Sequence, residues 1–221
     1  MKLNRENFRN LSNKDRAEIY ADVKEHNEIY LQSGPSFLKK IHESRFNSIK
    51  KLLGDTSNKK ILDAGTGEGY FLSSIKAKQK MGIELSEKRI QKAKKRYPDL
   101  DIKVGDVKNL PFEDNSFDVI VCSEVLEHVS EYEKAIMEFK RCINPEGFLV
   151  LSFPNEFTVS LGRLLILKFP IHEIDHINSI KPRDIEKFLG KKYTSLNVPN
   201  VKYPFCLYQI YRFEALDFKN L

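Results

Sequence analysis

The chain has 221 residues and a formal net charge of +6, with 41% hydrophobic and 31% charged residues. This composition is too apolar for a disordered protein, and the length allows a full hydrophobic core without disulfide or metal staples. No stretch approaches the ~20 apolar residues that a bilayer requires, and the first residues lack the apolar segment of a secretory signal. The three cysteines, Cys122, Cys142 and Cys206, have no C-x-x-C spacing, which favours reduced thiols in a cytoplasmic protein over a disulfide framework or a zinc site.

Residues 14–53 predict two helices that are separated by the breaker Ser33-Gly34-Pro35. Ser36 can cap the second helix, which carries an apolar stripe along one face. Arg45 lies on that stripe, where a charge needs a partner. We therefore expect residues 1–55 to form an N-terminal helical cap.

From residue 59 onward, short apolar runs alternate with helical patterns. The predicted strands are KKILDAG, KMGIELS, DIKVGD, FDVIVCSEV, GFLVLSF, YTSLNV and CLYQIYRFEAL. The predicted helices are YFLSSIKAK, SEKRIQKAKKRY, a long helix after residue 130, and Pro182 to Leu189 with Gly190 as its stop. Strands that alternate with helices imply right-handed crossovers and a parallel sheet covered on both faces. The sequence thus predicts a doubly wound α/β domain over residues 56–221.

The densest basic run is QKAKKR, residues 91–96, and such a run can contact nucleic acid. However, Ile90, Ala93 and Tyr97 recur at the spacing of an amphipathic helix, which places the lysines on its outer face. A solvated helix surface is therefore the favoured interpretation of this run.

The long helix after residue 130 has the spacing of a capping box at its start. Ser130 would accept a hydrogen bond from the first turn, and Glu133 would reach back to the main chain. The turn Asn144-Pro145-Glu146-Gly147 would end the helix. We therefore expect this helix to begin at Ser130.

The first predicted strand ends in a glycine-rich loop, Asp63-Ala64-Gly65-Thr66-Gly67-Glu68-Gly69, that passes directly into a helix. Glycines at such a turn let a nucleotide approach the main chain closely, although an ordinary glycine-rich connection is the alternative. Tyr70 replaces the third glycine of the NAD fingerprint, and no G-K-[ST] follows, which excludes a P-loop. Glu68 would repel a phosphate at the helix N-terminus. The loop therefore favours a positively charged nucleoside ligand without phosphate.

Two more acidic residues end the next two strands. Glu84 closes the second strand, where a carboxylate can accept hydrogen bonds from both ribose hydroxyls. Asp106 closes the third strand, where it can accept from an adenine amine while Val107 packs on the ring. Each residue alone is more often an ordinary strand-end side chain. Together with the loop, on three successive strands, they indicate a nucleoside site.

Four segments carry a family resemblance: ILDAGTGEGYF, GIELSEKRI, VGDVKNLPFEDNSFDVIVCSEVLEHV and INPEGFLVLSFPN. Together they resemble the class I S-adenosylmethionine-dependent methyltransferases, and within these the type 11 group of quinone-biosynthesis and other small-molecule enzymes. The resemblance is strong over residues 45–155 and looser in the C-terminal third. It implies a Rossmann-like, seven-stranded sheet with the last strand antiparallel, S-adenosylmethionine as the cofactor, and a small-molecule methyl acceptor. The apolar residues between Leu161 and Phe169 could roof the site and would then suit a lipophilic or aromatic acceptor, although ordinary core or a dimer surface is an equal alternative.

By this resemblance, the cofactor-binding residues stand near strand ends: Asp63, Gly65 and Gly67 for the methionine end, Glu84 for the ribose, and Asp106 with Val107 for the adenine. Ser123 and Glu124 follow the fourth strand and are weaker candidates for the same crevice. For Arg45, a salt bridge to the cofactor carboxylate and a structural ion pair both stay open.

An insertion at residues 157–180 follows the fifth strand and carries an apolar block with two histidines, and we expect it to form an acceptor-side lid. Its segment 172–176 spells H-E-x-x-H, the zinc-protease motif. Pro170 precedes the motif, Asp175 is charged and no convincing third ligand follows, so we expect no metal there. Methyl transfer needs a general base only if the acceptor loses a proton, and His176 is the first candidate, ahead of His128 and His172.

Nucleic acid is the alternative acceptor class, but the sequence speaks against it. The fourth strand ends in CSEVLEHV, without the [DN]-P-P-[FYW] motif of methyltransferases that act on base amines. Cys122 also lacks the preceding proline that accompanies the nucleophile of cytosine methyltransferases. A non-catalytic, cofactor-binding regulator is a further alternative. The oligomeric state stays open between a monomer and a homodimer.

Overall fold

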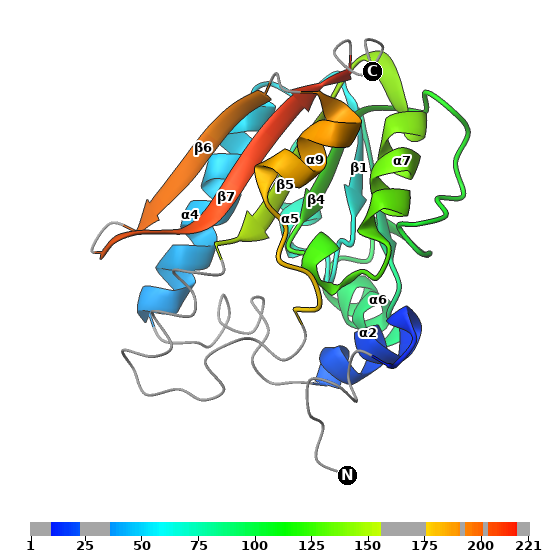
Figure 1. The fold of residues 1–221 in the computed structure, drawn as a ribbon. Coiled ribbons are helices and arrows are strands. Elements are labelled where there is room, and N and C mark those ends of the chain that lie inside the picture. The colour runs from blue at the N-terminus through cyan, green and yellow to red at the C-terminus, as the bar shows by residue number, and fades with distance from the viewer. Residues whose placement is uncertain (1–9, 23–35, 156–175, 191–192, 201–202, 216–221) are drawn as a thin grey trace.

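The computed structural model describes residues 10–22, 36–155, 176–190, 193–200 and 203–215. The strands are β1 (Lys60–Ala64), β2 (Gln79–Glu84), β3 (Asp101–Val104), β4 (Phe117–Ser123), β5 (Ile143–Pro154), β6 (Tyr193–Asn200) and β7 (Tyr203–Glu214). The helices are α2 (Asn13–Asp22), α4 (Ser36–Leu53), α5 (Tyr70–Ser73), α6 (Glu87–Arg96), α7 (Tyr132–Cys142) and α9 (Pro182–Leu189), with a short 3-10 helix, η1, at Leu126–His128. Figure 1 shows the helices arranged around a central sheet.

The strands form one seven-stranded sheet in the order β3-β2-β1-β4-β5-β7-β6. Strands β1 to β5 pair in parallel, whereas β7 lies antiparallel between β5 and β6. The predicted Rossmann-like α/β fold with an antiparallel last strand is therefore confirmed. The chain order reverses between β1 and β4, and in such a sheet ligands bind beyond the carboxyl ends of the strands at that point.

The hydrophobic core lies on both faces of the sheet. Along β1, Ile61 packs among residues of α4, α5 and α6, and the next residue, Leu62, packs toward α7 and α9. The same alternation holds on β4, where Val121 and Cys122 face opposite sides. A strand buried on both faces needs apolar residues at consecutive positions, which explains the continuous apolar runs in the sequence. Cys122 and Cys142 are free, buried thiols within this core.

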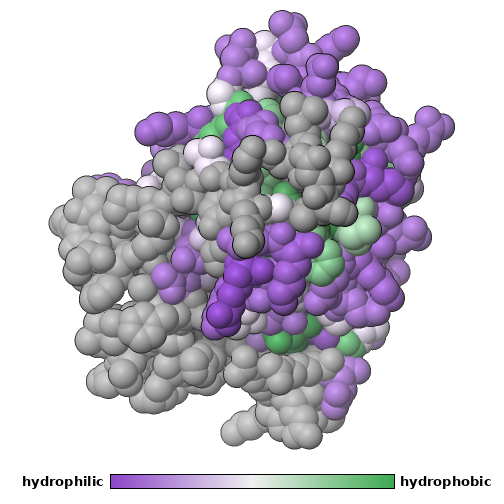
Figure 2. Space-filling model, turned by 45° about the horizontal axis from the view of Figure 1, so that its top comes forward, coloured by the Kyte–Doolittle hydropathy of each residue, from purple (hydrophilic) through white to green (hydrophobic). Residues whose placement is uncertain are grey.

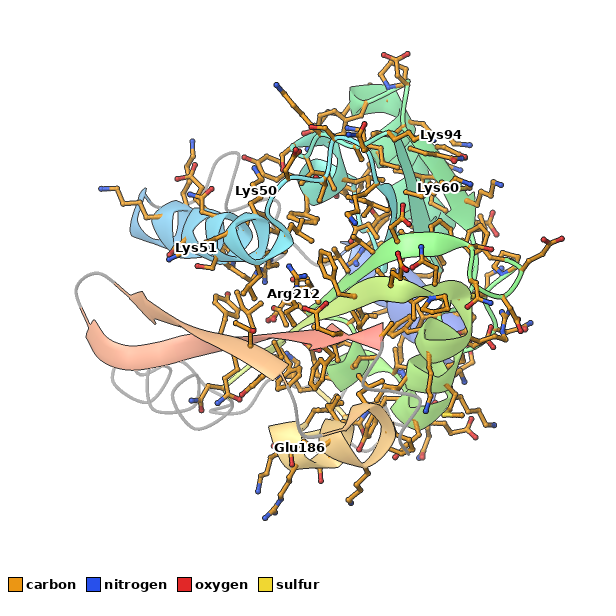
Figure 3. All side chains as sticks on the ribbon, turned by 90° about the horizontal axis from the view of Figure 1, so that it is seen from above. Lys50, Lys51, Lys60, Lys94, Glu186 and Arg212 are labelled. Carbon is orange, nitrogen blue, oxygen red and sulfur yellow. The ribbon has the colours of Figure 1, made fainter. Side chains whose placement is uncertain are left out.

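Helix α4 covers the antiparallel end of the sheet, against β5, β6 and β7. Arg212 of β7 lies on the side of α4 that faces the sheet (Figure 3). Its Nη1 donates to the carbonyl oxygen of Leu52 at 2.8 Å. The guanidinium also lies 3.6 Å from the ring centroid of Phe148. A cation at the last carbonyls of a helix stabilises its C-terminus, so Arg212 joins α4 to the sheet.

Two local helix predictions are wrong. The helix predicted from YFLSSIKAK ends early, since α5 stops at Ser73. The capping box at Ser130 does not form: the N-cap of α7 is Glu131, with a φ of 58° and no capping hydrogen bond from its side chain. Instead, the Ser130 hydroxyl donates to Oδ1 of Asn13 at 3.0 Å. A partner so distant in the chain leaves no trace in the local pattern.

Hydrophilic side chains dominate the coloured part of the face in Figure 2, with small hydrophobic patches between them. The large hydrophobic side chains that are exposed in the described part of the chain are Val104 and Met137, at 51% and 52%. Single exposed side chains of this kind are normal on protein surfaces and mark no site by themselves. In the described ranges, no helix combines the length and apolar character that a membrane crossing demands.

Candidate functional site

A cavity lies beyond the carboxyl ends of β1, β2, β3 and β4, where the strand order reverses. It holds about 1250 Å³ of space, part of which is open to solvent. The residues predicted to bind the cofactor all line it: Arg45, Asp63, Gly65, Gly67, Glu84, Asp106, Val107 and Ser123. The structure therefore brings these residues, which are spread over more than 70 positions of the chain, to one cavity.

The glycine loop after β1 is tied closely to β2. The backbone N–H groups of Gly65 and Thr66 both donate to the carbonyl oxygen of Ile83, at 2.8 and 2.9 Å. Gly65 has a φ of 84°, and a Cβ at this position would lie 2.3 Å from Cγ2 of Val125. Both the backbone conformation and the lack of space require glycine here, so the loop can lie directly against a ligand.

Asp63 is a buried carboxyl group at the start of the loop. Its Oδ2 accepts a hydrogen bond from Oγ1 of Thr66 at 2.7 Å. Burial raises the pKa of Asp63, the Thr66 hydrogen bond lowers it and the nearby charge of Glu84 raises it, so that the pKa comes to about 7. Asp63 therefore titrates near neutral pH, and a bound cation would favour its ionised form.

Glu84, at the end of β2, supports the loop with both carboxylate oxygens. Oε2 accepts from the backbone N–H of Gly67 at 3.0 Å, and Oε1 accepts from the backbone N–H of Ser86 at 2.9 Å. Arg89 Nη1 lies 3.9 Å from Oε2. Each carboxylate oxygen has a second lone pair, so Glu84 can still accept hydrogen bonds from ligand hydroxyls in the cavity.

The charge of Glu68 in the loop is balanced by α6. Its Oε1 lies 3.4 Å from Nζ of Lys92, and its Oε2 lies 3.7 Å from Nη1 of Arg96. Two cations of the basic run thus pair with the loop, although they are exposed like Lys94 and Lys95, in agreement with the predicted solvated helix surface. Part of the Glu68 charge that was expected to disfavour a phosphate is therefore balanced within the protein.

Asp106 and Val107 follow β3 at the edge of the cavity. Asp106 Oδ1 accepts from the backbone N–H of Lys108 at 2.9 Å, which closes a short turn. Val107 is buried, with 7% of its surface exposed. This arrangement gives the cavity one carboxylate beside one apolar wall.

Ser123 and Glu124 belong to a hydrogen-bonded chain at the end of β4. Ser123 Oγ donates to Ser152 Oγ at 3.3 Å, and Ser152 Oγ donates to Glu124 Oε1 at 2.7 Å. Glu124 adopts a φ of 57°, which is unusual for a residue with a side chain. The chain of hydroxyls holds the Glu124 carboxylate in place beside the cavity.

Arg45 of α4 enters the cavity from the helix side and is 3% exposed. Its Nη1 lies 3.6 Å from Glu124 Oε2, and its guanidinium lies over the rings of Phe46 and Tyr208 at 4.8 and 4.9 Å. The buried Nε and Nη1 atoms nevertheless make no hydrogen bond. The structural ion pair is therefore present, and it leaves two buried nitrogens of the guanidinium without a hydrogen bond.

Helix α2 contributes cavity residues that sequence reasoning missed: Asn13, Arg16 and Ala17. The helix packs beside α6 (Figure 1), where the Lys14 ammonium lies 3.2 Å from Glu87 and the Glu18 carboxylate accepts from the Glu87 backbone N–H at 2.8 Å. The sequence of α2 has no apolar periodicity that would predict this packing, because the contacts with Glu87 are polar.

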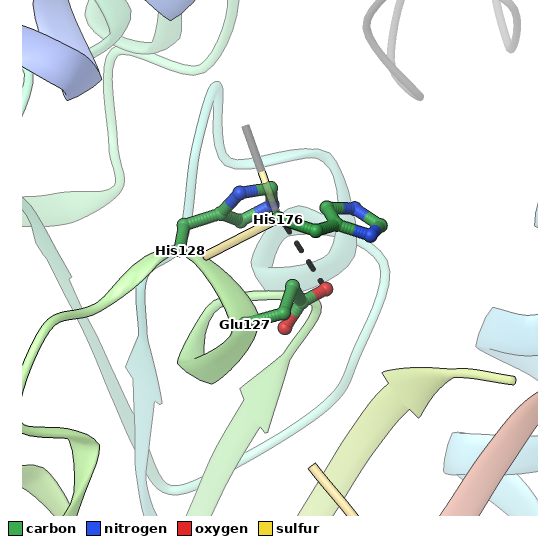
Figure 4. A group of neighbouring side chains, drawn as sticks. All are labelled: Glu127, His128 and His176. Atoms are coloured by element: carbon green, nitrogen blue, oxygen red, sulfur yellow. Dashed lines mark ion pairs between the residues drawn. The ribbon is translucent and has the colours of Figure 1, made fainter. Parts of the chain in front are cut away.

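Glu127, His128 and His176 form a second group of side chains (Figure 4), and His128 also lines the cavity. Glu127 of η1 is 1% exposed, and His128 Nε2 lies 3.9 Å from its Oε1. The rings of His128 and His176 meet edge to face with centroids 5.0 Å apart. Burial, together with the charge of Glu124, raises the pKa of Glu127 well above its usual range, against the opposing charges of His176 and Arg45. His172 and most of the predicted lid lie outside the described residues.

Comparisons with known proteins identify the class. Residues 62–151 match the family model for a methyltransferase domain. A Mycolicibacterium smegmatis protein named "Probable S-adenosylmethionine-dependent methyltransferase" is 34% identical over 116 residues, which cover 52% of this chain and 45% of that protein. The predicted resemblance is confirmed: residues 62–151 are similar to the methyltransferase domain of the S-adenosylmethionine-dependent methyltransferases. Within that class, the matching family is the type 11 group.

Two more proteins are similar to this chain, one in sequence and one in fold. A demethylmenaquinone methyltransferase from Thermotoga maritima is 32% identical over 107 residues, 47% of each chain. The chain thus spans about half the length of these curated relatives. A crystal structure of an S-adenosylmethionine-dependent methyltransferase from Thermotoga maritima shares the fold, with a TM-score of 0.68 and 19% identity over 90% of this chain and 99% of that one.

Proposed function

We propose that this protein binds S-adenosylmethionine in the cavity and transfers its methyl group to a small acceptor. The observation that carries the proposal is the order of groups along the cavity: the glycine loop after β1, Glu84 after β2 and Asp106 after β3. A nucleoside with a positively charged substituent fits this order. Asp106 lies at the end for the base, Glu84 in the middle can accept from the ribose hydroxyls, and the glycine loop lies at the end for the charged substituent.

The buried polar atoms of the cavity fit this cofactor. Glu84 would accept the ribose hydroxyls, and Asp106 with Val107 would hold the adenine. At the other end, Asp63 offers a carboxylate to the positive charges, and Gly65 leaves no side chain in the way. The free donors on Nε and Nη1 of Arg45 suit the carboxylate of the methionine end.

When bound, the cofactor supplies a methyl group on a positively charged sulfur. That sulfur would also accept the electron pair of the broken carbon–sulfur bond once the acceptor's lone pair bonds the methyl carbon. The protein contributes mainly alignment of the two partners in a site shielded from water. The loop, Glu84 and Arg45 would set the position of the methyl group, and no proton needs to move unless the acceptor carries one on the reacting atom.

The acceptor would meet the methyl group at the end of the cavity that Asn13, Arg16 and His128 line. The lid over residues 157–180 stays a prediction, because residues 157–175 lie outside the described part of the chain. A small acceptor of lipophilic or aromatic type is supported by the similarity to the demethylmenaquinone methyltransferase.

The first experiment measures thermal unfolding with three ligands: S-adenosylmethionine, S-adenosylhomocysteine and NAD. A ligand at about 100 times its dissociation constant stabilises the folded protein by roughly 2.7 kcal/mol, so both adenosyl ligands should raise the Tm and NAD should not. A shift with NAD and none with the adenosyl ligands would contradict the proposal.

The acceptor class is tested with a labelled methyl group. The protein, the methyl-labelled cofactor and a cell extract are incubated together, and the labelled product is identified by mass spectrometry. Label in small lipophilic molecules supports the proposal. Label in RNA supports the alternative acceptor class, and tight cofactor binding without any labelled product supports a regulator.

A further inference from the structure

Three side chains of metal-ligating type meet beside the cavity: Glu127, His128 and His176 (Figure 4). One ligand atom from each, a carboxylate oxygen or a ring nitrogen, lies within 4.8 Å of the other two. Glu127 and His128 are neighbours on η1, whereas His176 comes from the segment that leads to α9. The fold, and not a local motif, assembles the group.

The Glu127 carboxylate indicates that a ligand belongs here. Its side chain is 2% exposed, and neither Oε1 nor Oε2 makes a hydrogen bond. A buried carboxylate without hydrogen bonds is costly, since its lost hydration is not replaced. The ion-pair distance of 3.9 Å to His128 applies only while that ring is protonated. A cation would compensate both oxygens.

The backbone around the group is fixed in place. The N–H groups of Ile177 and Asn178 both donate to the main-chain oxygen of Glu127, at 2.9 and 3.1 Å. The Asn178 side chain donates to the carbonyl oxygens of Leu126 and Val129, at 3.1 and 2.7 Å. These bonds tie the His176 segment to η1 on both sides of Glu127. Such support holds ligands in a geometry that a cation can use without refolding of the chain.

We propose that Glu127, His128 and His176 bind one divalent transition-metal ion, with zinc the first candidate. Two imidazoles and one carboxylate form the donor set of open zinc sites and of non-haem iron sites, whereas magnesium and calcium prefer oxygen ligands alone. Ligand distances of about 2.0–2.2 Å require the three groups to move inward by less than about 1 Å, which side-chain rotation provides. The site departs from the expectation of no metal, which considered only the H-E-x-x-H motif.

The metal would lie next to the reacting groups. His128 lines the cavity, so an open coordination position could take an oxygen of the acceptor and orient it toward the methyl group. This role in turnover rests on the proposed function, but binding of the metal does not. A titration without any methyl donor therefore tests the site by itself.

The test uses the full chain after treatment with a chelator. Zinc affinity and stoichiometry are measured by competition with a chromophoric chelator, and cobalt is added separately because its visible absorption reports coordination by nitrogen and oxygen. We expect one zinc per chain. Glu127→Gln and His176→Ala should each weaken zinc binding by at least about 10–100-fold. Loss of a residue that only hydrogen-bonds to a metal ligand already has an effect of this size, so loss of a ligand itself should have at least the same effect.

His172→Ala is the matched control, because it removes the other histidine of the H-E-x-x-H motif. Our site predicts unchanged zinc affinity in this variant. Circular dichroism tests whether each variant is folded. If Glu127→Gln does not fold, His128→Ala replaces it as the second ligand variant. Three results would overturn the site: no zinc binding, zinc binding that all the ligand variants retain, or loss in His172→Ala together with retention in Glu127→Gln.

Discussion

Arg45 of α4 and Glu124 after β4 form a buried ion pair, with 3.6 Å between Nη1 and Oε2 and side chains that are 3% and 10% exposed. The pair joins an N-terminal helix to the carboxyl end of a central strand. Because Nε and Nη1 of Arg45 make no hydrogen bond, the ion pair does not saturate the guanidinium. The two interpretations of Arg45, structural pair and cofactor ligand, are therefore compatible.

Glu124→Gln should destabilise the unliganded protein by about 3–5 kcal/mol, because it leaves the buried Arg45 charge without its partner. If Arg45 also meets the cofactor carboxylate, S-adenosylhomocysteine should raise the Tm of this variant by more than it raises the wild-type Tm. Thermal unfolding with and without the ligand measures both effects. Glu43→Gln on the same helix removes a half-exposed pair with Lys39 and should change stability by less than about 1 kcal/mol. Equal ligand-induced shifts in Glu124→Gln and wild type would assign Arg45 a structural role alone.

The raised pKa of Asp63, about 7, predicts that cofactor affinity depends on pH. Below pH 7 the buried carboxyl group is protonated and must release its proton to pair with a bound cation. The affinity for S-adenosylmethionine should therefore rise as the pH increases from 6 to 8 and then level off. Titration calorimetry in two buffers of different ionisation enthalpy detects the released proton. The ligand's own amine also titrates, and its contribution to the pH dependence of the affinity should remain in Asp63→Asn, whereas the contribution of Asp63 should vanish. If the affinity changes equally with pH in both proteins, Asp63 does not pair with the bound cation.

The same carboxyl group affects stability without ligand. Its pKa in the folded protein lies above the ordinary value of 3.8, so the folded state binds more protons than the unfolded state between about pH 4 and 7. The free energy of unfolding should consequently fall as the pH rises through this window. In Asp63→Asn this contribution to the fall should be absent. Urea unfolding at several pH values gives the comparison, and a stability that is the same function of pH in both proteins would contradict it.

Glu84→Ala should weaken cofactor binding for two reasons. It removes the acceptor for the ribose hydroxyls, and it frees the backbone N–H groups of Gly67 and Ser86 that the carboxylate now binds. Loss of a hydrogen bond to a charged group costs about 1.5–3 kcal/mol, so we expect at least a tenfold increase in Kd by calorimetry. Glu84→Gln keeps one acceptor oxygen and should lie between alanine and wild type. An unchanged Kd in Glu84→Ala would mean that another group holds the ribose.

Gly65→Ala separates backbone strain from steric exclusion when it is compared with Gly54→Ala. Both glycines have positive φ, 84° and 64°, but only at Gly65 would a Cβ meet another atom, Cγ2 of Val125 at 2.3 Å. Gly54→Ala should cost about 1–2 kcal/mol from backbone conformation alone. Gly65→Ala should cost clearly more and should displace the loop from the cavity. Chemical denaturation measures both, and Val125→Ala combined with Gly65→Ala should restore part of the loss.

The sequence alone determined the layered α/β fold and the location of the cavity. Apolar runs and helical periodicity are local properties, and the order of strands and crossovers along the chain allows few sheets. Because parallel strands end at the same edge, residues at the ends of β1, β2 and β3 must meet there. Glu84 and Asp106 could therefore be assigned to one cavity without any knowledge of their contacts.

Tertiary structure alone decided which partners these side chains find. Ser130 carries the local signal of a helix cap, yet it donates to Asn13, and Glu68 is balanced by α6 instead of by a ligand. His176 meets Glu127, which lies 49 positions earlier in the chain. In each case the contact joins segments far apart in the chain. Its energy depends on burial and on distances of a few ångströms, which the packing of the whole domain sets and no short stretch of sequence encodes.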